Sequence, residues 1–524
     1  MKLGLLETTD GRPHHHSPAG EPDVAFSTSW FAAASRWTNE DGRPVTADAI
    51  LKDPQGSRRA RRGAAIRKWA PAVLLVVVPL LLVSLHVRAY TKLSPIDELE
   101  HIDYMFRSPG LHPVIAGTTL VEPAMREEAC RGLDSVYPTP PCDTKKLSIS
   151  VFQDQGYDTA YIHPPTYYDT TWAAGELVKT ATGAKSWVTA WRLVGALWLA
   201  VGLLVTYAAG LRMGVKSLPL VGLLILFASA PSIIQTNSTV TPDAASTFIG
   251  GAALYLMARW EEGGRWRWIA LVGIGFVGTA IKLQDTIIVM MVIMYFLLRA
   301  GKRATIAVDG GVVSETGPVP ALNASPGGLL RRGALVPLRL YRNAYTRAAG
   351  IVLTTTLAIA ASWTVLQRVT ETIDPNKILV IGQFVVSSIT LQQIASTFGA
   401  FVAPLPGAYV PPSTESVWTM DMVYLLSWLL IAGIVAGAIF IARTHEMASL
   451  ARATLTLAIL GGPIVTILNY VTMSQYIPLP PRYGFTLLPA MVVCTADAIR
   501  TRWAGICTVA VGLLGVAFVA YQLA

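Results

Sequence analysis

The sequence predicts an all-α polytopic membrane protein that crosses the bilayer about eleven times. Of its 524 residues, 52% are hydrophobic and only 14% are charged, and the mean hydropathy is +0.46, which is too apolar for a soluble protein. Apolar runs of about 20 residues, long enough to cross roughly 30 Å of hydrocarbon, recur along the chain. The cations lie mainly beside these runs, so the net charge of +9 indicates a membrane face and no nucleic-acid partner.

Residues 1–69 are expected to form a disordered, basic tail in the cytoplasm. The tail is polar, and no cleavable signal peptide is evident, because the first apolar run begins only near residue 70. By the positive-inside rule, the cations before this run keep its N-terminal end inside: Arg58, Arg59, Arg61, Arg62, Arg67 and Lys68. The transmembrane domain is therefore expected over residues 70–524, with a first span over residues 70–89.

The stretch LSPIDELEHIDYMF, which follows the first span, holds the densest set of ionisable side chains in the chain. Pro95 suits a helix start, where carboxylates are favoured by the helix dipole. In such a helix Asp97 and His101 would share a face, and Glu98 and His101 would be neighbours. Asp97 and Glu98 themselves would diverge by roughly 100°. Two interpretations stay open: a solvated helix start, or a cluster that carries chemistry.

The remainder of the first extracytoplasmic loop, which covers residues 91–186 in total, contains two further motifs. Cys130 and Cys142 enclose the segment CRGLDSVYPTPPC, and in an oxidising compartment such a close pair is expected to form a disulfide. The segment YIHPPTYYDTTW follows, with His163 before a Pro-Pro turn. An aromatic belt at the membrane interface accounts for Tyr167 better than for His163.

Spans two to six are expected over residues 187–212, 218–234, 244–258, 269–281 and 286–298. Asp243, in TVTPDAAS, lies at the start of the fourth span, where it caps the helix or serves a site. Lys282, in AIKLQD, lies between the fifth and sixth spans with hardly any loop. A charged lysine in this place costs free energy unless its side chain extends to the membrane surface, pairs with Asp285 or binds an anion.

The last five spans are expected over residues 351–366, 422–442, 454–471, 484–498 and 505–522. A basic cytoplasmic loop, residues 299–347, precedes them. A second extracytoplasmic segment, residues 367–420, contains Arg368 and Lys377. Its composition favours a helix that lies at the membrane interface or dips partly into the bilayer. Arg482 and Tyr483, in PPRYGFTLLP, lie at the outer start of the tenth span. This alternation places the N-terminus inside and the C-terminus outside.

The ionisable residues that hydropathy does not explain all fall on the outer side: Asp97, Glu98, His101, His163, Asp243, Lys282, Arg368, Lys377 and Arg482. Carboxylates that face cations in an outer cleft suit the transfer of a group from an anionic lipid carrier to a hydroxyl acceptor. A carboxylate takes the proton of the acceptor, and a cation stabilises the leaving phosphate. Sugar transfer fits well, because carboxylates also stabilise the positive charge that develops at a glycosyl centre.

The motifs SPIDELEH, HPPTYY, TVTPDAAS, AIKLQD and PPRYGFTLLP, in this order and topology, resemble those of the GT-C superfamily of membrane glycosyltransferases, which use polyprenyl-phosphate sugars. Within it, the chain is similar to a bacterial group of predicted integral-membrane proteins whose first loop carries Pro-Asp-Glu-Pro-x-x-His. The resemblance covers residues 70–498. Two departures matter: Ile96 separates Pro95 from Asp97, and Leu99 stands where the group tends to have proline. The base is therefore Asp97 or Glu98.

The resemblance implies an inverting transfer from a polyprenyl-phosphate sugar to an envelope glycan, lipid or protein, on the outer face of the bacterial plasma membrane. Asp97 is expected to be the base, with Glu98 as its competitor and His101 orienting the carboxylate or the acceptor. The donor phosphate is expected at Lys282 and Arg482, with Arg368 and Lys377 as weaker candidates. The substrate cleft would be lined by His163, Tyr167, Asp243 and Tyr483.

No cofactor and no nucleotide-sugar site is expected, since the chain has no glycine-rich phosphate loop followed by Lys-Ser/Thr. No metal ligands are assigned; a divalent cation at the carboxylates stays open, although their spacing gives it no support.

Two other functions compete with sugar transfer. A transporter or flippase of a lipid-linked glycan would place ionisable groups near the middle of the membrane, between internal repeats. Most of the expected span interiors lack charge, and the sequence shows no convincing internal repeat. A non-catalytic envelope scaffold would use the first loop to bind a partner.

Overall fold

The computed structural model of the chain describes residues 54–108, 113–135, 138–308, 343–374, 382–407 and 417–524. In these ranges the chain is all-helical, and the only strand-like pairings are three isolated bridges, Leu93 with Leu133, Thr119 with Tyr157 and Val385 with Gln475. The chain divides into two units, Met1–Lys68 and Trp69–Ala524. The second unit contains the helical bundle and every site discussed below.

Seven helices of the described part are long and apolar enough to cross a membrane. They are α2 (Pro54–Ala89), α6 (Trp187–Arg212), α11 (Thr286–Val308), α13 (Ala344–Thr370), α16 (Val417–Ala436), α17 (His445–Met473) and α19 (Arg502–Leu523). Helices α7 (Ser217–Ala228) and α8 (Pro231–Asn237) form a pair bent by 68°, which gives an eighth span if they cross together. The prediction of an all-helical protein with several membrane-spanning helices is confirmed at this level.

The other three expected spans correspond to shorter helices: α9 (Ser246–Glu262), α10 (Arg267–Ala280) and α18 (Leu488–Ala498). At 1.5 Å per residue, the 11 residues of α18 extend over only about 16 Å. Three 3-10 turns start or join these helices: η5 (Pro242–Ala245), η6 (Leu283–Asp285) and η10 (Pro481–Leu487), and η10 contacts both of the others. These turns bring Asp243, Lys282 and Arg482 to one end of the bundle.

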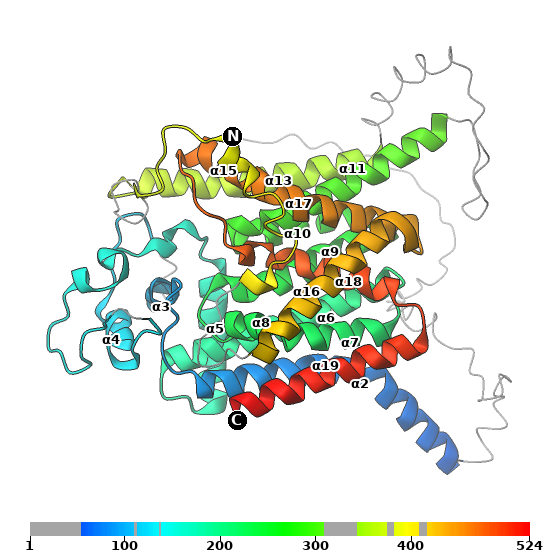
Figure 1. Cartoon of the computed structure of the whole chain (residues 1–524), viewed down its shortest axis with the longest axis horizontal. Helices are drawn as coiled ribbons and strands as arrows, with labels where there is room; N and C mark the ends of the chain where they lie inside the picture. Colours follow the sequence, from blue (N-terminus) through cyan, green and yellow to red (C-terminus); the bar gives the residue numbers. More distant parts are fainter. Residues whose placement is uncertain (1–53, 109–112, 136–137, 309–342, 375–381, 408–416) are drawn as a thin grey trace, which may run out of the picture. The chain divides into compact units, whose positions relative to one another are not determined.

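Small residues allow the bundle helices to approach closely. A Cβ atom on Gly195 of α6 would lie 1.9 Å from the backbone oxygen of Asn237 in α8. The other helix of the bent pair, α7, packs along α19, where a Cβ on Gly222 would lie 2.5 Å from the backbone nitrogen of Val509 (Figure 1). These contacts hold the broken span α7–α8 between α6 and α19.

The first loop folds into short helices: α3 (Glu98–Arg107), α4 (Glu122–Arg131), η2 (Ile149–Val151), η3 (Gln153–Gly156), η4 (Thr159–Ile162) and α5 (Thr166–Thr182). Figure 1 shows α3 and α4 together at one end of the bundle, and α3 also packs on α5. The expected disulfide between Cys130 and Cys142 is present. Helix α13 holds the loop, because Trp363 Nε1 donates to the oxygen of Ile162 at 3.2 Å and Gln367 Nε2 to that of Val114 at 3.1 Å.

The second expected outer segment is mostly irregular in its described part. It contains α15 (Leu391–Ala395) and η8 (Leu405–Gly407). Phe401 anchors it, fully buried beside Gly461 of α17 and Gly484 of η10. Helix α16 continues into η9 (Gly437–Ile441), a π-helix turn. Residues 309–342 of the expected basic loop lie outside the described part, and α11 extends into the start of that loop.

Candidate functional site

Four charged residues from four separate segments form one chain of ion pairs. Asp243 Oδ1 pairs with Lys282 Nζ, and Asp243 Oδ2 lies 3.1 Å from Arg482 Nε. Arg482 Nη2 in turn lies 3.2 Å from Asp97 Oδ2. The sequence placed all four on one side of the membrane, and the structure brings them into direct contact. We call Asp97, Arg482, Asp243 and Lys282 the charge cluster.

The members of the charge cluster differ in their exposure to solvent. Asp243 and Lys282 are buried, whereas the side chain of Asp97 is 55% exposed. Burial alone would raise the pKa of Asp243, but Lys282 and Arg482 together lower it below its ordinary value. Burial alone would lower the pKa of Lys282, but Asp243 raises it. Both groups are therefore charged, and the ring of Tyr483, 4.7 Å from Lys282 Nζ, adds a cation–π contact.

Asp97 occupies a left-handed backbone conformation directly before α3. Its φ is 56° and its ψ is 11°, which is uncommon for a residue other than glycine, and its side chain caps no helix amide. The side chain points instead to Arg482. The expected pairing of Asp97 with His101 on one helix face is replaced by these separate contacts, because α3 begins only at Glu98.

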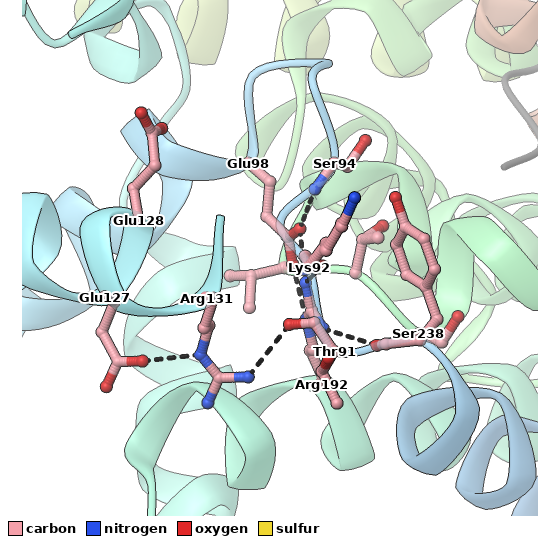
Figure 2. A network of polar contacts seen from close by, with 12 residues as sticks. Thr91, Lys92, Ser94, Glu98, Glu127, Glu128, Arg131, Arg192 and Ser238 are labelled. Atoms are coloured by element: carbon pink, nitrogen blue, oxygen red, sulfur yellow. Dashed lines mark hydrogen bonds and ion pairs between the residues drawn. The ribbon is translucent and has the colours of Figure 1, made fainter. Parts of the chain in front are cut away.

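Glu98, the neighbouring candidate for the base, is enclosed by hydrogen-bond donors. Arg192 Nε and Nη2 donate to its two carboxylate oxygens, each at 2.8 Å, and the amides of Ser94 and Val240 donate at 2.7 and 3.0 Å. Both charged side chains are 1% exposed. Figure 2 shows this bidentate pair and the Ser94 amide bond. Glu98 therefore joins the first loop to α6 and to the segment before η5.

Sequence reasoning missed Arg192. The available signal was an arginine inside an apolar run, and a charge in such a place nearly always pairs with another group. Arg192 also donates to the backbone oxygens of Tyr90 and Lys92, at 3.1 and 2.7 Å. It thereby fixes the chain between the end of α2 and the start of α3.

His101 and His163 lie side by side near the charge cluster. Their ring centroids are 5.5 Å apart, and His101 Nδ1 is hydrogen-bonded to the hydroxyl of Tyr168 at 2.9 Å. Burial lowers the pKa of His101 to about 3 and that of His163 well below its ordinary value, so both rings are neutral. The hydroxyl of Tyr167 accepts from the amide of Thr241 at 3.2 Å. Tyr167 therefore positions the segment that carries Asp243.

A small open recess of about 40 Å³ adjoins the charge cluster. Its lining comes from the first-loop start, the end of α8 and the two turns η5 and η10: Ser94, Ile96, Gln235, Thr236, Thr239, Thr241, Asp243 and Arg482. Gln235 and the threonines were not singled out from the sequence, although QTNSTVT is an unusually polar end for a span. These residues add uncharged hydrogen-bonding groups to the site.

Of the two remaining expected cations, Arg368 is described, and it does not join the charge cluster. Arg368 is exposed on α13, where its Nη2 donates to the backbone oxygen of Thr472 at 3.2 Å. Lys377 lies outside the described residues. Over the described ranges, no group of three or more His, Cys, Asp or Glu side chains is placed to hold a metal ion.

No family model and no curated protein matches the chain. The chemistry of the site therefore follows from its own groups. Asp97 is a half-exposed carboxylate whose pKa is raised by burial, so it can accept a proton. Arg482 and Lys282 are two cations that share one buried partner, Asp243. An anionic ligand at these cations would compete with Asp243, and a hydroxyl at Asp97 would meet a base.

Proposed function

We propose that the protein is a GT-C-like membrane glycosyltransferase that moves a sugar from a polyprenyl-phosphate donor to a hydroxyl of a cell-envelope glycan, lipid or protein. The observation that carries this proposal is the contact of half-exposed Asp97 with Arg482, which continues through Asp243 to Lys282. The contact lies where apolar helices end, so a lipid carrier in the bilayer can bring its phosphate to the cations. The side of the membrane is taken to be extracytoplasmic.

In the proposed reaction, Asp97 is the general base. The acceptor oxygen attacks the anomeric carbon, its proton passes to the Asp97 carboxylate, and the bond from the anomeric carbon to the phosphate oxygen breaks. The leaving polyprenyl phosphate keeps the electron pair of that bond, and Arg482 and Lys282 stabilise its negative charge. Attack opposite to the leaving group inverts the anomeric configuration.

Asp243 has a positioning role in this proposal. It lies between both cations and holds them charged and oriented before the donor arrives. Pre-organised charges of this kind need little rearrangement when charge develops on the leaving group. The donor phosphate binds on the open side of Arg482, which also faces Asp97.

The test uses purified protein in lipid nanodiscs with a panel of radiolabelled polyprenyl-phosphate hexoses and pentoses and extracted envelope acceptors. The Asp97→Asn variant should transfer about 10²- to 10⁴-fold more slowly, since it keeps the shape but cannot take a proton. Asp143→Asn, which changes an exposed aspartate of the same loop, is the matched control and should leave transfer unchanged. Full activity of Asp97→Asn would refute the assigned base, and no transfer from any donor would refute the function.

One observation favours a second candidate, a transporter of a lipid-linked glycan. The bend of 68° between α7 and α8 interrupts a span beside the recess, and interrupted helices form substrate sites in many transporters. Proteoliposomes loaded with a fluorescent lipid-linked glycan distinguish the two candidates. Movement of the intact glycan between leaflets, with no change in its sugar content, would favour transport over transfer.

A further inference from the structure

The primary amide of Gln235 is buried at the recess without a hydrogen-bond partner. The residue is 3% exposed and lines the recess, and neither Nε2 nor Oε1 has a partner among the described residues. Buried amides in native proteins are nearly always hydrogen-bonded, because an unpaired one has lost its water and gained nothing. Gln235 is therefore set to bond a group that enters the recess.

The other walls define which group fits. The hydroxyls of Thr236 and Thr239 donate to the helix oxygens of Ser232 and Gln235, at 2.8 and 3.1 Å, so they offer only lone pairs to the recess. Thr241 Oγ1 accepts from the amide of Asp243 at 3.3 Å and keeps its own hydrogen to donate. The recess thus presents acceptors and donors together, with Asp243 at its edge.

This mixture fits hydroxyl groups better than it fits ions. A phosphate only accepts hydrogen bonds and would face the lone pairs of two threonines and the carboxylate of Asp243. An ammonium only donates and would leave the Gln235 Nε2 hydrogens unpaired. Two neighbouring hydroxyls both donate and accept, so one can accept from Nε2 while the other donates to Oε1.

The volume of the recess limits the size of this group. A water needs about 10 to 15 Å³ of such space, so 40 Å³ holds about three waters or two hydroxyls, and no complete sugar ring. The recess is open on one side, so the rest of the ligand lies outside it, toward Arg482. The arrangement suits one edge of a pyranose or furanose ring.

We propose that Gln235 is a specificity-determining residue that reads two neighbouring hydroxyls of the transferred sugar. This inference rests on the proposed function, since it takes the ligand to be the sugar of the polyprenyl-phosphate donor. A site with buried polar groups rejects an analogue that lacks the matching hydroxyl, because the protein group is then left unpaired. Gln235 thus separates the correct sugar from its deoxy analogue, while Arg482 and Lys282 bind the phosphate that all donors share.

The experiment measures binding by purified protein in nanodiscs. The probes are polyprenyl phosphate without sugar, the polyprenyl-phosphate sugars of the same panel, and single-deoxy analogues of the sugar that binds best. Wild-type protein should bind one deoxy analogue about 10- to 100-fold more weakly than the parent. Gln235→Met, which keeps the size of the side chain but not its amide, should bind the parent as weakly as that analogue. Its affinity for sugar-free polyprenyl phosphate should not change.

Two further variants keep the result interpretable. Thr239→Val removes one acceptor from the recess without changing its shape, and it should lower the affinity for the parent sugar about 3- to 10-fold. This variant tests the recess if Gln235→Met does not fold. Gln392→Leu, which changes an exposed glutamine of α15, is the matched control and should bind as wild type does.

The inference would be overturned if wild type and folded Gln235→Met bound every sugar with the same affinity, because the recess would then hold only water. If wild type binds no sugar-bearing carrier better than polyprenyl phosphate alone, the proposed function itself fails and the inference falls with it.

Discussion

Asp97 and Glu98 are adjacent in the chain but have opposite surroundings. The side chain of Asp97 is 55% exposed and contacts one cation, whereas that of Glu98 is 1% exposed and accepts four hydrogen bonds. A general base needs a free lone pair within reach of the acceptor, and Glu98 has none to offer without losing Arg192. The geometry therefore favours Asp97 as the base and gives Glu98 a structural role.

Substitution of Glu98 separates these roles. Glu98→Gln leaves the Arg192 cation buried without a counter-charge, and breaking a buried pair in this way costs about 3 to 5 kcal/mol. We expect a large fall in the thermal unfolding midpoint. Asp97→Asn loses a half-exposed pair, which costs at most about 1 kcal/mol. A Glu98→Gln protein with the wild-type midpoint and no transferase activity would instead identify Glu98 as the base.

Glu100, Glu128 and Asp154 of the first loop also have raised pKa values. Glu100 is buried, and neither of its carboxylate oxygens has a partner among the described residues, so burial raises its pKa well above the ordinary value. Burial also raises the pKa of Glu128 to about 7, against a weaker opposing bond from Gln153, and that of Asp154 to about 6. In Figure 2, Glu128 points away from the neighbouring pair of Glu127 and Arg131. Burial therefore favours the protonated form of these carboxyls, whereas Lys282 and Arg482 lower the pKa of Asp243.

Glu128 makes the stability of the loop depend on pH. Its pKa is 4.5 when unfolded and about 7 when folded, so the folded state binds more protons between these values. The contribution of Glu128 to the free energy of unfolding is fully present below about pH 4.5. As the pH rises to about 7, the free energy of unfolding falls by on the order of 1 to 3 kcal/mol. Glu128→Gln, which is neutral throughout, should be more stable than wild type at pH 8 and similar to it at pH 4.5.

Thermal unfolding and hydrogen exchange of the first loop at the two pH values measure this difference. Glu122→Gln, at an exposed carboxylate of the same helix, is the control. An equal change of stability with pH in wild type and Glu128→Gln would contradict the assignment.

At the scale of elements, the site depends on where α8 ends. The chain after α8 supplies Val240, whose amide binds Glu98, and Asp243 of the charge cluster. Gly195 fixes this position, because α8 approaches α6 where a Cβ would lie 1.9 Å from the Asn237 backbone oxygen. A backbone atom cannot move aside cheaply, so α8 itself must shift if a side chain is added.

Gly195→Ala should therefore displace α8 and loosen the charge cluster. We expect a loss of about 1 to 3 kcal/mol of stability and a fall in transferase activity. Gly350→Ala in α13 is the matched control, since its Cβ would meet no atom within 4 Å and alanine favours the helix by up to about 1 kcal/mol. The unfolding midpoints of both variants measure the effect. A Gly195→Ala protein as stable and active as wild type would show that α8 can move without harm.

Hydropathy predicts long helices well and their interruptions poorly. The second span was expected over residues 187–212, which are the bounds of α6, because lipid contact along a whole helix depends on local composition. The bend between α7 and α8 and the 3-10 starts of α9 and α18 depend on tertiary contacts such as that of Gly195 with Asn237. Hydropathy averaged over neighbouring residues carries no information on such contacts.

The candidate site shows the same limit of sequence-based prediction. The shared side of Asp97, Asp243, Lys282 and Arg482 follows from alternating spans, but the Arg192 partner and the unpaired Gln235 amide need three-dimensional neighbours.

The second unit has a group of cations at the end opposite the charge cluster. These cations connect helix ends. Lys216 donates a hydrogen bond to the backbone oxygen of Arg500, and Arg500 donates to that of Ile441. Three ion pairs join other helix ends: Arg443 with Asp497, Arg212 with Glu262 and Arg299 with Glu446. The ends of α6, α9, α11, α17, α18 and α19 meet there. By the positive-inside rule we expect this end to face the cytoplasm and the charge cluster to face out.

Labelling of single cysteines in intact cells tests this orientation. The background is Cys507→Ser, which removes the exposed native thiol, while Cys494 is buried and Cys130 and Cys142 are bonded to each other. Two single cysteines are introduced. Lys185→Cys changes the exposed turn between α5 and α6, at the same end of the bundle as the charge cluster. Arg265→Cys changes the exposed turn between α9 and α10, at the opposite end.

A membrane-impermeant maleimide should label residue 185 in intact cells and residue 265 only after the cells are permeabilised, because the lipid bilayer separates the two turns. Each variant is the control for the other, since both thiols are exposed and differ only in the end of the bundle. The reverse pattern would place Asp97 and Arg482 in the cytoplasm. The donor phosphate would then have to arrive from the inner leaflet, and the proposed transfer to envelope acceptors outside the cell would lose its basis.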